Sequence, residues 1–141
     1  MAAGLHADQA PRAVGNYPHA RRVGRLLFLS GIGPRNPADN TVPGNVVGKD
    51  GRVIAYDIDA QARATFANVA AVLAASGARW EDLVDVTVFL TDMAADFSAF
   101  NAIWAEYFPD AARAPCRTTV GVSALPTPIA IELKCTAVVE E

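Results

Sequence analysis

The stretch DIDAQARATFANVAAVLAASGARWEDLVDVTVFLT, residues 57–91, decides the fold class, because its hydrophobic period changes within it. From Asp57 to Ser76, apolar side chains recur at three- and four-residue steps, and this spacing predicts a helix. Asp57 is a preferred residue at a helix start, and Gly77 stands where helix ends favour glycine. From Leu83 to Thr91, alternating side chains predict a strand. A helix followed directly by a strand indicates a fold of mixed type.

The side chains of each of these two elements divide into distinct faces. On the helix, the apolar stripe consists of Ile58, Ala62, Phe66, Val69 and Leu73. On the strand, one face is formed by Val84, Val86, Val88 and Leu90, and the other by Asp85, Thr87, Phe89 and Thr91.

Three further elements are predicted towards the C-terminus. Residues Asp96 to Phe108 are expected to form a second helix, which Pro109 ends. Its aromatic face consists of Phe97, Phe100, Trp104 and Phe108. Residues 116–122 and 129–139 are expected to form the last two strands. The last strand alternates between an apolar face and a mixed face that carries Glu132 and Lys134.

The N-terminal part of the chain is less regular. Leu26 to Ser30 is a short apolar run, and we expect it to pair with Tyr17 to Val23 as a hairpin through Gly24. Residues 31–56 are rich in Gly, Pro and Asn, and they allow a short strand at 52–55. A loop of this length in a compact domain is usually functional or partly disordered. Residues 1–12 are expected to form a flexible arm.

The predicted order is strands, helix, strand, helix, strand, strand. Two helices cover only one face of such a sheet, so we predict a two-layer α+β domain that spans residues 1–141. The uncovered face must then be polar or meet another copy of the chain. Because the last strand carries a mixed face there, a closed homo-oligomer is expected.

Composition excludes several classes of function. The chain has 141 residues, 52% of them hydrophobic, and a net charge of −3, which gives no general attraction to nucleic acid. It lacks a signal-peptide pattern and any apolar run long enough to span a membrane, so we expect a cytoplasmic protein. Two cysteines make no disulfide framework, and the spacing of His and Cys does not resemble a zinc site. We therefore expect neither a metal nor an organic cofactor.

Two charged residues stand out on the last two strands. Arg117 is the second residue of the run Cys116-Arg117-Thr118-Thr119-Val120-Gly121-Val122, and Glu132 lies in an otherwise largely apolar strand. Charges in such strands are costly to bury without a partner or a purpose. A guanidinium presents a planar fork suited to a carboxylate, and a glutamate can orient or activate a water. The pair points to a small anionic substrate attacked by water.

Several short motifs, taken in order, resemble the RidA family, also called the YjgF family, of enamine and imine deaminases. The motifs are Gly15-Asn16-Tyr17, Leu29-Ser30-Gly31, Asp59-Ala60-Gln61-Ala62-Arg63, Val86-Thr87-Val88-Phe89-Leu90, Asn101 with Tyr107-Phe108, Arg117-Thr118-Thr119-Val120 with Leu125-Pro126, and Ile131-Glu132. The resemblance spans residues 11–139. It implies a chorismate-mutase-like fold, a homotrimer, and active sites in the clefts between subunits.

The resemblance also implies roles for individual residues. Arg117 would grip the substrate carboxylate, and Glu132 would position the attacking water. Asn101 would lie at the subunit cleft, where a structural hydrogen bond is the alternative. Tyr17 and Ser30 would line the pocket, although the Ser30 hydroxyl could instead bond the backbone at a strand end. Thr119 replaces the cysteine that better-known members carry, where the family role falls chiefly to backbone groups.

Within the family, the chain is most similar to the 2-aminomuconate deaminases. The similarity lies in the loop from Ser30 to Thr41, in the long segment up to Asp59, and in Ile131-Glu132-Leu133-Lys134. A muconate carries two carboxylates, so a second cation is needed beside Arg117. Arg35 could meet the distal carboxylate, and an ordinary exposed loop arginine is the alternative.

The resulting expectation is a metal-independent hydrolase that converts 2-aminomuconate to 4-oxalocrotonate and ammonia in the catabolism of aromatic compounds. One alternative is a general deaminase of 2-aminoacrylate-type enamines and imines. Another is a trimeric module that binds 2-oxo acids without turnover. The expected partners are a small anionic substrate and further copies of the chain, without nucleic acid or membrane.

Overall fold

A computed structural model of the chain describes residues 3–140. In chain order, its elements are β1 Ala20–Val23, β2 Leu26–Leu29, β3 Val46–Val47, β4 Val53–Ala55, α1 Ile58–Ala75, a 3₁₀ turn Trp80–Asp82, β5 Leu83–Leu90, α2 Met93–Tyr107, β6 Cys116–Gly121 and β7 Ile131–Val138. No helix within this described part is long and apolar enough to cross a membrane.

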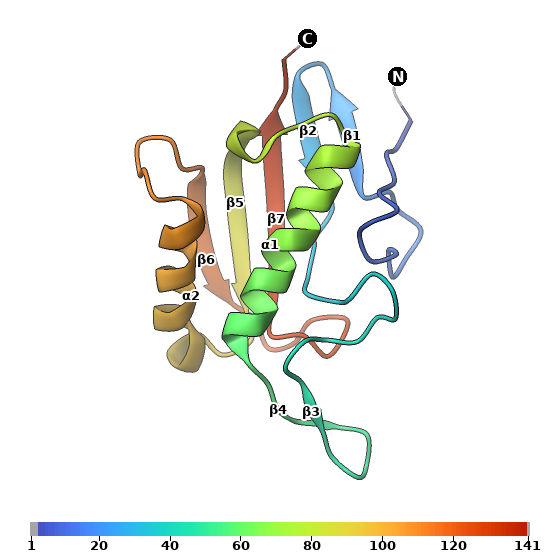
Figure 1. Cartoon of the computed structure of the whole chain (residues 1–141), viewed down its shortest axis with the longest axis vertical. Helices are drawn as coiled ribbons and strands as arrows, with labels where there is room; N and C mark the ends of the chain where they lie inside the picture. The colour runs from blue at the N-terminus through green and yellow to red at the C-terminus, as the bar shows by residue number, and fades with distance from the viewer. Residues whose placement is uncertain (1–2, 141) are drawn as a thin grey trace.

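The main sheet has the strand order β1-β2-β7-β5-β6. Strands β5 and β6 run parallel, whereas the other neighbouring pairs are antiparallel, so the sheet is mixed. Both helices lie on the same face of this sheet (Figure 1). The predicted two-layer α+β architecture is therefore confirmed, and so is the hairpin through Gly24 that joins β1 and β2.

Helix α1 begins and ends where the sequence predicts. The Asp57 carboxylate accepts the N–H of Ala60 at 3.1 Å, which satisfies one of the free donors of the first turn. Gly77 takes a φ of +76°, a conformation that residues with a Cβ rarely adopt, and the chain leaves the helix there. The buried stripe contains Ala62, Phe66, Val69 and Leu73, as expected.

Helix α2 begins one turn earlier than predicted. The Asp92 carboxylate accepts the N–H of Ala95 at 3.1 Å, so Asp92 is the N-cap and the helix starts at Met93. Its buried apolar residues are Phe100 and Ile103, whereas Phe97 is 37% exposed. The predicted aromatic face is thus wrong at Phe97, which lies at the rim of the helix–sheet interface.

The expected alternation of β5 is wrong at Val84. The pairing of β5 with β7 shifts register between Leu83 and Asp85, as at a β-bulge. Leu83 is buried, and Val84 is 42% exposed instead of sharing the buried face of Val86. An extra residue in one strand rotates the side chains that precede it, which a strict period of two cannot anticipate.

Residues 3–12 do not extend away from the domain as a loose arm. The N–H of Leu5 donates to the carbonyl of Ala20 at 2.7 Å, which attaches the segment to β1. Ala7 and Ala10 are buried in the core. The expectation of a flexible arm is therefore wrong for these residues, and residues 1–2 lie outside the described part.

The segment 31–56 contains a second, two-stranded sheet. Strands β3 and β4 form a hairpin that projects from one end of the molecule (Figure 1). Next to it, the Asn45 side chain donates to the carbonyl of Pro128 at 2.9 Å and accepts from the buried Gln61 amide at 2.9 Å. The short strand expected at 52–55 is confirmed as β4, and its partner β3 was missed.

The face of the main sheet opposite the helices carries mixed side chains. Because side chains alternate along a strand, the neighbours of buried Ile131, Leu133 and Cys135 point to this open face. Strand register then places neighbouring residues in rows: Phe28, Thr136, Asp85 and Cys116; Lys134, Thr87 and Thr118; and Glu132, Phe89 and Val120. The face combines apolar, hydroxyl and charged groups, as the sequence predicts for the last strand.

Candidate functional site

Arg117 lies on β6 and points towards helix α2. Its guanidinium carbon lies 5.0 Å from the ring centroid of Trp104, 5.7 Å from that of Phe100 and 5.8 Å from that of Phe97. Aromatic faces attract a cation but do not neutralise it. Burial lowers the pKa of Arg117. Within residues 3–140, no carboxylate forms an ion pair with it.

Thr119 follows Arg117 on the same face of β6. Its hydroxyl oxygen is buried, and it has no hydrogen-bond partner among the described residues. Buried polar groups are normally bonded, and an orphaned one costs about 1–3 kcal/mol. A half-buried cation without an anion therefore lies beside a hydroxyl without a partner. A ligand with a carboxylate and further polar atoms could pair with the Arg117 guanidinium and form a hydrogen bond with the Thr119 hydroxyl.

Glu132 lies on β7 and points to the opposite face of the sheet. It borders a cavity of about 160 Å³ with Val14, Tyr17, Gly31, Gly33, Arg35, Pro126 and Thr127. Burial raises the pKa of Glu132, and the positive charge of Arg35 acts in the other direction. A Cβ atom on Gly31 would lie 2.8 Å from a Glu132 carboxylate oxygen, so a larger residue there would collide with it.

Arg35 reaches the same cavity from the loop after β2. Its Nη1 donates to Oδ1 of Asn40 at 3.0 Å, and its Nη2 donates to the carbonyl of Arg12 at 2.8 Å. Asn40 adopts a φ of +64°, the left-handed conformation that asparagine tolerates better than most residues. The guanidinium is thus held by two neutral acceptors, and its charge is left to act on Glu132 and on whatever occupies the cavity.

The other residues considered from the sequence do not all lie at one of these two places. Tyr17 is 41% exposed and borders the Glu132 cavity. The Ser30 hydroxyl donates to the carbonyl of Pro18 at 2.7 Å, which is the backbone bond that the sequence left as the alternative. Asn101 is exposed on α2, on the helix turn between Phe97 and Trp104. Lys134 donates to the carbonyl of Leu29.

The predicted residues therefore fall into two groups on opposite faces of one sheet. Arg117 and Thr119 lie under α2, and Asn101 lies on that helix. Glu132, Arg35 and Tyr17 surround the cavity on the open face. Because the sheet separates the two groups, one chain cannot bring Arg117 and Glu132 to the same small molecule. A site that uses both needs a second copy.

Sequence reasoning missed two buried amides on α1. Gln61 is fully buried, and its Oε1 accepts the N–H of Ala130 at 2.8 Å. Asn68 is 5% exposed, and its amide donates to the carbonyls of Gly33 and Arg35. These contacts attach helix α1 to the two loops that border the Glu132 cavity. The available signal was their helical spacing, since Gln61, Thr65 and Asn68 adjoin the apolar stripe.

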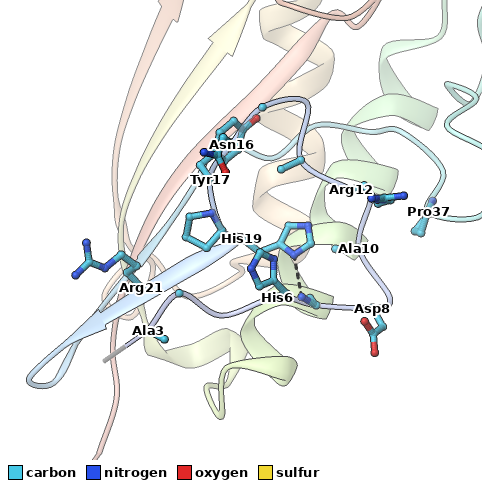
Figure 2. A pocket seen from close by; sticks show the side chains of 15 residues that line it. Ala3, His6, Asp8, Ala10, Arg12, Asn16, Tyr17, His19, Arg21 and Pro37 are labelled. Atoms are coloured by element: carbon cyan, nitrogen blue, oxygen red, sulfur yellow. Dashed lines mark hydrogen bonds between the residues drawn. The ribbon is translucent and has the colours of Figure 1, made fainter. Parts of the chain in front are cut away.

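A larger cavity, of about 930 Å³, lies along the N-terminal segment (Figure 2). His19 holds this segment together, because its Nδ1 accepts the N–H of Ala7 at 2.8 Å and its Nε2 donates to the carbonyl of Pro11 at 2.7 Å. Tyr17 borders both cavities, but Arg117 and Glu132 do not border this one. No group of three or more His, Cys, Asp and Glu side chains in residues 3–140 is arranged to hold a metal ion.

Known proteins resemble this chain along almost its whole length. The family model described as endoribonuclease L-PSP matches residues 7–139. A RutC family protein of Synechocystis is 40% identical over 95% of this chain and 94% of its own length. Reactive Intermediate Deaminase A, a chloroplastic protein of Arabidopsis thaliana, is 33% identical over 94% of this chain and 64% of its own length.

Solved structures also resemble this chain along almost its whole length. The crystal structure of Escherichia coli TdcF with bound serine superposes with a TM-score of 0.83 at 28% identity, and the match covers 99% of this chain and 100% of that one. A match of this extent covers the whole sheet and both helices. The chain therefore belongs to the endoribonuclease L-PSP family, which is also the family of the RidA, YjgF and RutC proteins.

Proposed function

We propose that the chain is a hydrolytic deaminase of enamines and imines that carry a carboxylate, with its active site between copies in a homotrimer. The observation that carries the proposal is the state of Arg117, a half-buried cation among aromatic rings with no carboxylate partner among the described residues. A substrate carboxylate would supply the missing anion with two parallel hydrogen bonds. The adjacent orphaned hydroxyl of Thr119 supports a ligand at this place.

The two faces of the sheet then divide the chemistry between two copies. Arg117 of one copy holds the substrate carboxylate, and Glu132 of the next copy orients a water. The enamine first tautomerises to the imine. The water adds to the imine carbon, the nitrogen takes up a proton, the C–N bond breaks, and ammonia and a 2-oxo acid leave. An imine is already electrophilic, so orientation and charge stabilisation are the main contributions of the protein.

For the substrate, we propose 2-aminomuconate, which would yield 4-oxalocrotonate in the breakdown of aromatic compounds. Arg35 supports this choice, because it places a second cation at the Glu132 cavity. Among residues 3–140, its guanidinium donates to the neutral acceptors Asn40 and the carbonyl of Arg12 and forms no ion pair. A dicarboxylate would bind Arg117 at one end and Arg35 at the other. Tyr17 would cover the substrate from the solvent side.

A general deaminase of 2-aminoacrylate-type intermediates is the second candidate. The observation that favours it is the 33% identity to Reactive Intermediate Deaminase A, and such a substrate has a single carboxylate. A module that binds 2-oxo acids without turnover would need Arg117 but not Glu132. RNA cleavage, which the family description names, has less support, because twelve Lys and Arg stand against fifteen Asp and Glu.

We also propose a cytoplasmic location. Both cysteines are free, with Cys135 buried and Cys116 exposed, and this pattern is typical of a reducing compartment. The proposed partners are the small anionic substrate and two further copies of the chain, without nucleic acid or membrane.

The test is ammonia release from freshly generated 2-aminomuconate, compared with release from 2-aminoacrylate. Wild type is expected to release ammonia above the spontaneous rate, and Arg117→Ala and Glu132→Ala are expected to lose that excess. Arg113→Ala is the matched control, since Arg113 is an exposed loop arginine near Asp110. Equal rates on both substrates would favour the general deaminase, and no excess on either would refute the deaminase proposal.

A further inference from the structure

Asn68 is a buried amide in the middle of helix α1. It is 5% exposed and stands beside the buried residues Phe66 and Val69. An amide in such surroundings is costly unless its hydrogen bonds are made. Its Nδ2 donates to the carbonyl of Gly33 at 2.8 Å and to the carbonyl of Arg35 at 2.9 Å. Both N–H groups of the Asn68 side chain therefore donate to the same loop, at residues 33 and 35.

The loop begins at a point that is already fixed. Ile32 exchanges two backbone hydrogen bonds with Leu133 on β7, at 2.9 and 2.8 Å. Pro34 is buried between the two carbonyls that Asn68 holds. The backbone position of Arg35 is therefore set by a rigid helix and a central strand rather than by the long loop itself. Residues held by such elements keep a more exact geometry than loop residues.

The far end of Arg35 is restrained as well. Asn40 and the carbonyl of Arg12 accept from its two terminal nitrogens. The guanidinium is thereby held at the cavity of Glu132, and its remaining N–H groups are available to a ligand. A carboxylate there would gain a charge-assisted contact, which falls off when the donor moves by about 1 Å.

We infer that Asn68 is a positioning residue: by holding the carbonyls of Gly33 and Arg35, it keeps Arg35 opposite Glu132 and sets the preference of the site for substrates with a second carboxylate. This inference rests on the proposed function, since it assigns a substrate class to the same site. Asn68 itself lies behind the loop and does not border the cavity. Its effect on specificity is exerted through Arg35.

Two binding ligands of equal chain length separate this role from a merely structural one. 2-Oxohexanedioate and 2-oxohexanoate differ only in the distal carboxylate, and isothermal titration calorimetry measures their affinities for the intact oligomer without any turnover. Wild type is expected to prefer the dicarboxylate about tenfold, the scale of one charge-assisted hydrogen bond. Arg35→Ala is expected to abolish that preference.

Asn68→Leu is expected to lose most of the preference while its affinity for 2-oxohexanoate stays near that of wild type. The double variant with Arg35→Ala should lose no more than Arg35→Ala alone, because both changes act on one contact. The matched control is Thr65→Val, which removes another buried hydrogen bond of α1, from the Thr65 hydroxyl to the carbonyl of Gln61 at 2.8 Å. It should keep the full preference. Asn68→Ser serves if the leucine variant does not fold.

The outcomes are distinguishable. A folded Asn68 variant that keeps the wild-type preference, or weakens both ligands equally, would overturn the role of Asn68 and leave the deaminase standing. Equal affinity of wild type for the two ligands would overturn the dicarboxylate preference and the role of Asn68 in setting it, and would leave the deaminase standing. Binding of neither 2-oxo acid by wild type would refute the proposed function, and with it the inference that depends on it.

Discussion

At the scale of single residues, the two charged groups of the site are shifted by the same physical cause. Burial disfavours the charged form of each, so it raises the pKa of Glu132 and lowers that of Arg117. Neither has an ion-pair partner within residues 3–140. Unpaired charges whose pKa is shifted by burial are typical of functional sites, and Glu132 also borders a cavity. The sequence predicted both residues because each charged side chain stands in a largely apolar strand. The lack of an ion-pair partner in the structure is the spatial counterpart of that isolation.

The pH dependence of activity follows from the environment of Glu132. In the proposed mechanism the Glu132 carboxylate must be ionised to accept a proton from water, so kcat/KM is expected to fall as the pH falls through its raised pKa. The positive charge of Arg35 lowers that pKa, so Arg35→Ala should move the acid limb of the profile to higher pH. Arg35→Lys, which keeps a charge, should move it less. The measurement is kcat/KM against pH on a monocarboxylate substrate, and an unmoved acid limb would contradict it.

Removing the buried hydroxyl of Thr119 is expected to stabilise the fold, whereas most substitutions of buried residues destabilise it. Thr119→Val keeps the shape of the side chain and removes a buried oxygen that has no partner among residues 3–140, so the free energy of unfolding should rise by about 1 kcal/mol. Thr65→Val is the matched comparison, because that hydroxyl donates to Gln61 and its loss should destabilise. Chemical denaturation measures both. A loss of stability in Thr119→Val would show that the hydroxyl is satisfied from outside the chain.

At the scale of elements, helix α2 illustrates how capping overrides an apolar pattern. The aromatic spacing predicted a start at Asp96, but the free N–H groups of the first turn are served by Asp92. Asp96 instead lies inside the helix and accepts from the hydroxyl of Tyr56 at 2.5 Å. Burial raises the pKa of Asp96. This contact attaches the start of α2 to the segment between β4 and α1.

Removing the Asp92 cap should destabilise helix α2, whose aromatic side chains pack against Arg117. Asp92→Ala is expected to lower the free energy of unfolding by about 1 kcal/mol, the usual cost of losing an N-cap side chain. Asp92→Asn is the control, since asparagine caps equally well and keeps the acceptor. Thermal unfolding measures both variants. Equal destabilisation by alanine and asparagine would mean that the charge of Asp92, and not its hydrogen bond, supports the helix.

At the scale of the whole molecule, the sheet itself separates the site. Arg117 and Glu132 lie on strands that are both neighbours of β5, yet they point to opposite faces. The open face is partly apolar, with Leu26 42% and Phe28 41% exposed. A surface of this kind is suited to contact with further copies. The proposed use of Arg117 and Glu132 on one substrate and the exposed apolar residues both lead to the prediction that the chain associates with further copies.

Mixed oligomers test that requirement directly. Arg117→Ala and Glu132→Ala chains are each expected to be inactive alone. After unfolding and refolding together in equal amounts, about a quarter of the sites should regain an intact pair, because each residue is drawn at random from the two chains. Ammonia release from the mixture measures the recovery, with separately refolded variants as controls. No recovery, in oligomers shown to be mixed, would place both residues of a site in one chain.

The sequence by itself determined the period of each main element, the two-layer arrangement and the identity of the two charged residues. Helix α1, strand β7 and the β1–β2 hairpin follow from local spacing, capping and turn residues, which act within a few positions of the chain. The same locality explains the errors. The bulge at Val84, the packing of residues 3–12 on β1 and the cap of α2 depend on hydrogen bonds or register with partners that spacing does not reveal.

Only the tertiary structure decided where the candidate residues stand relative to one another. The side of the sheet on which Arg117 and Glu132 lie depends on the register of β5 with β6 and β7, which a single strand does not contain. The approach of Arg35 to Glu132 depends on Asn68, which is 33 residues away from Arg35 along the chain. Burial, pKa shifts and cavities arise from contacts distant in sequence. The sequence pattern therefore indicates which residues are candidates for a site, and only the folded structure determines their geometry.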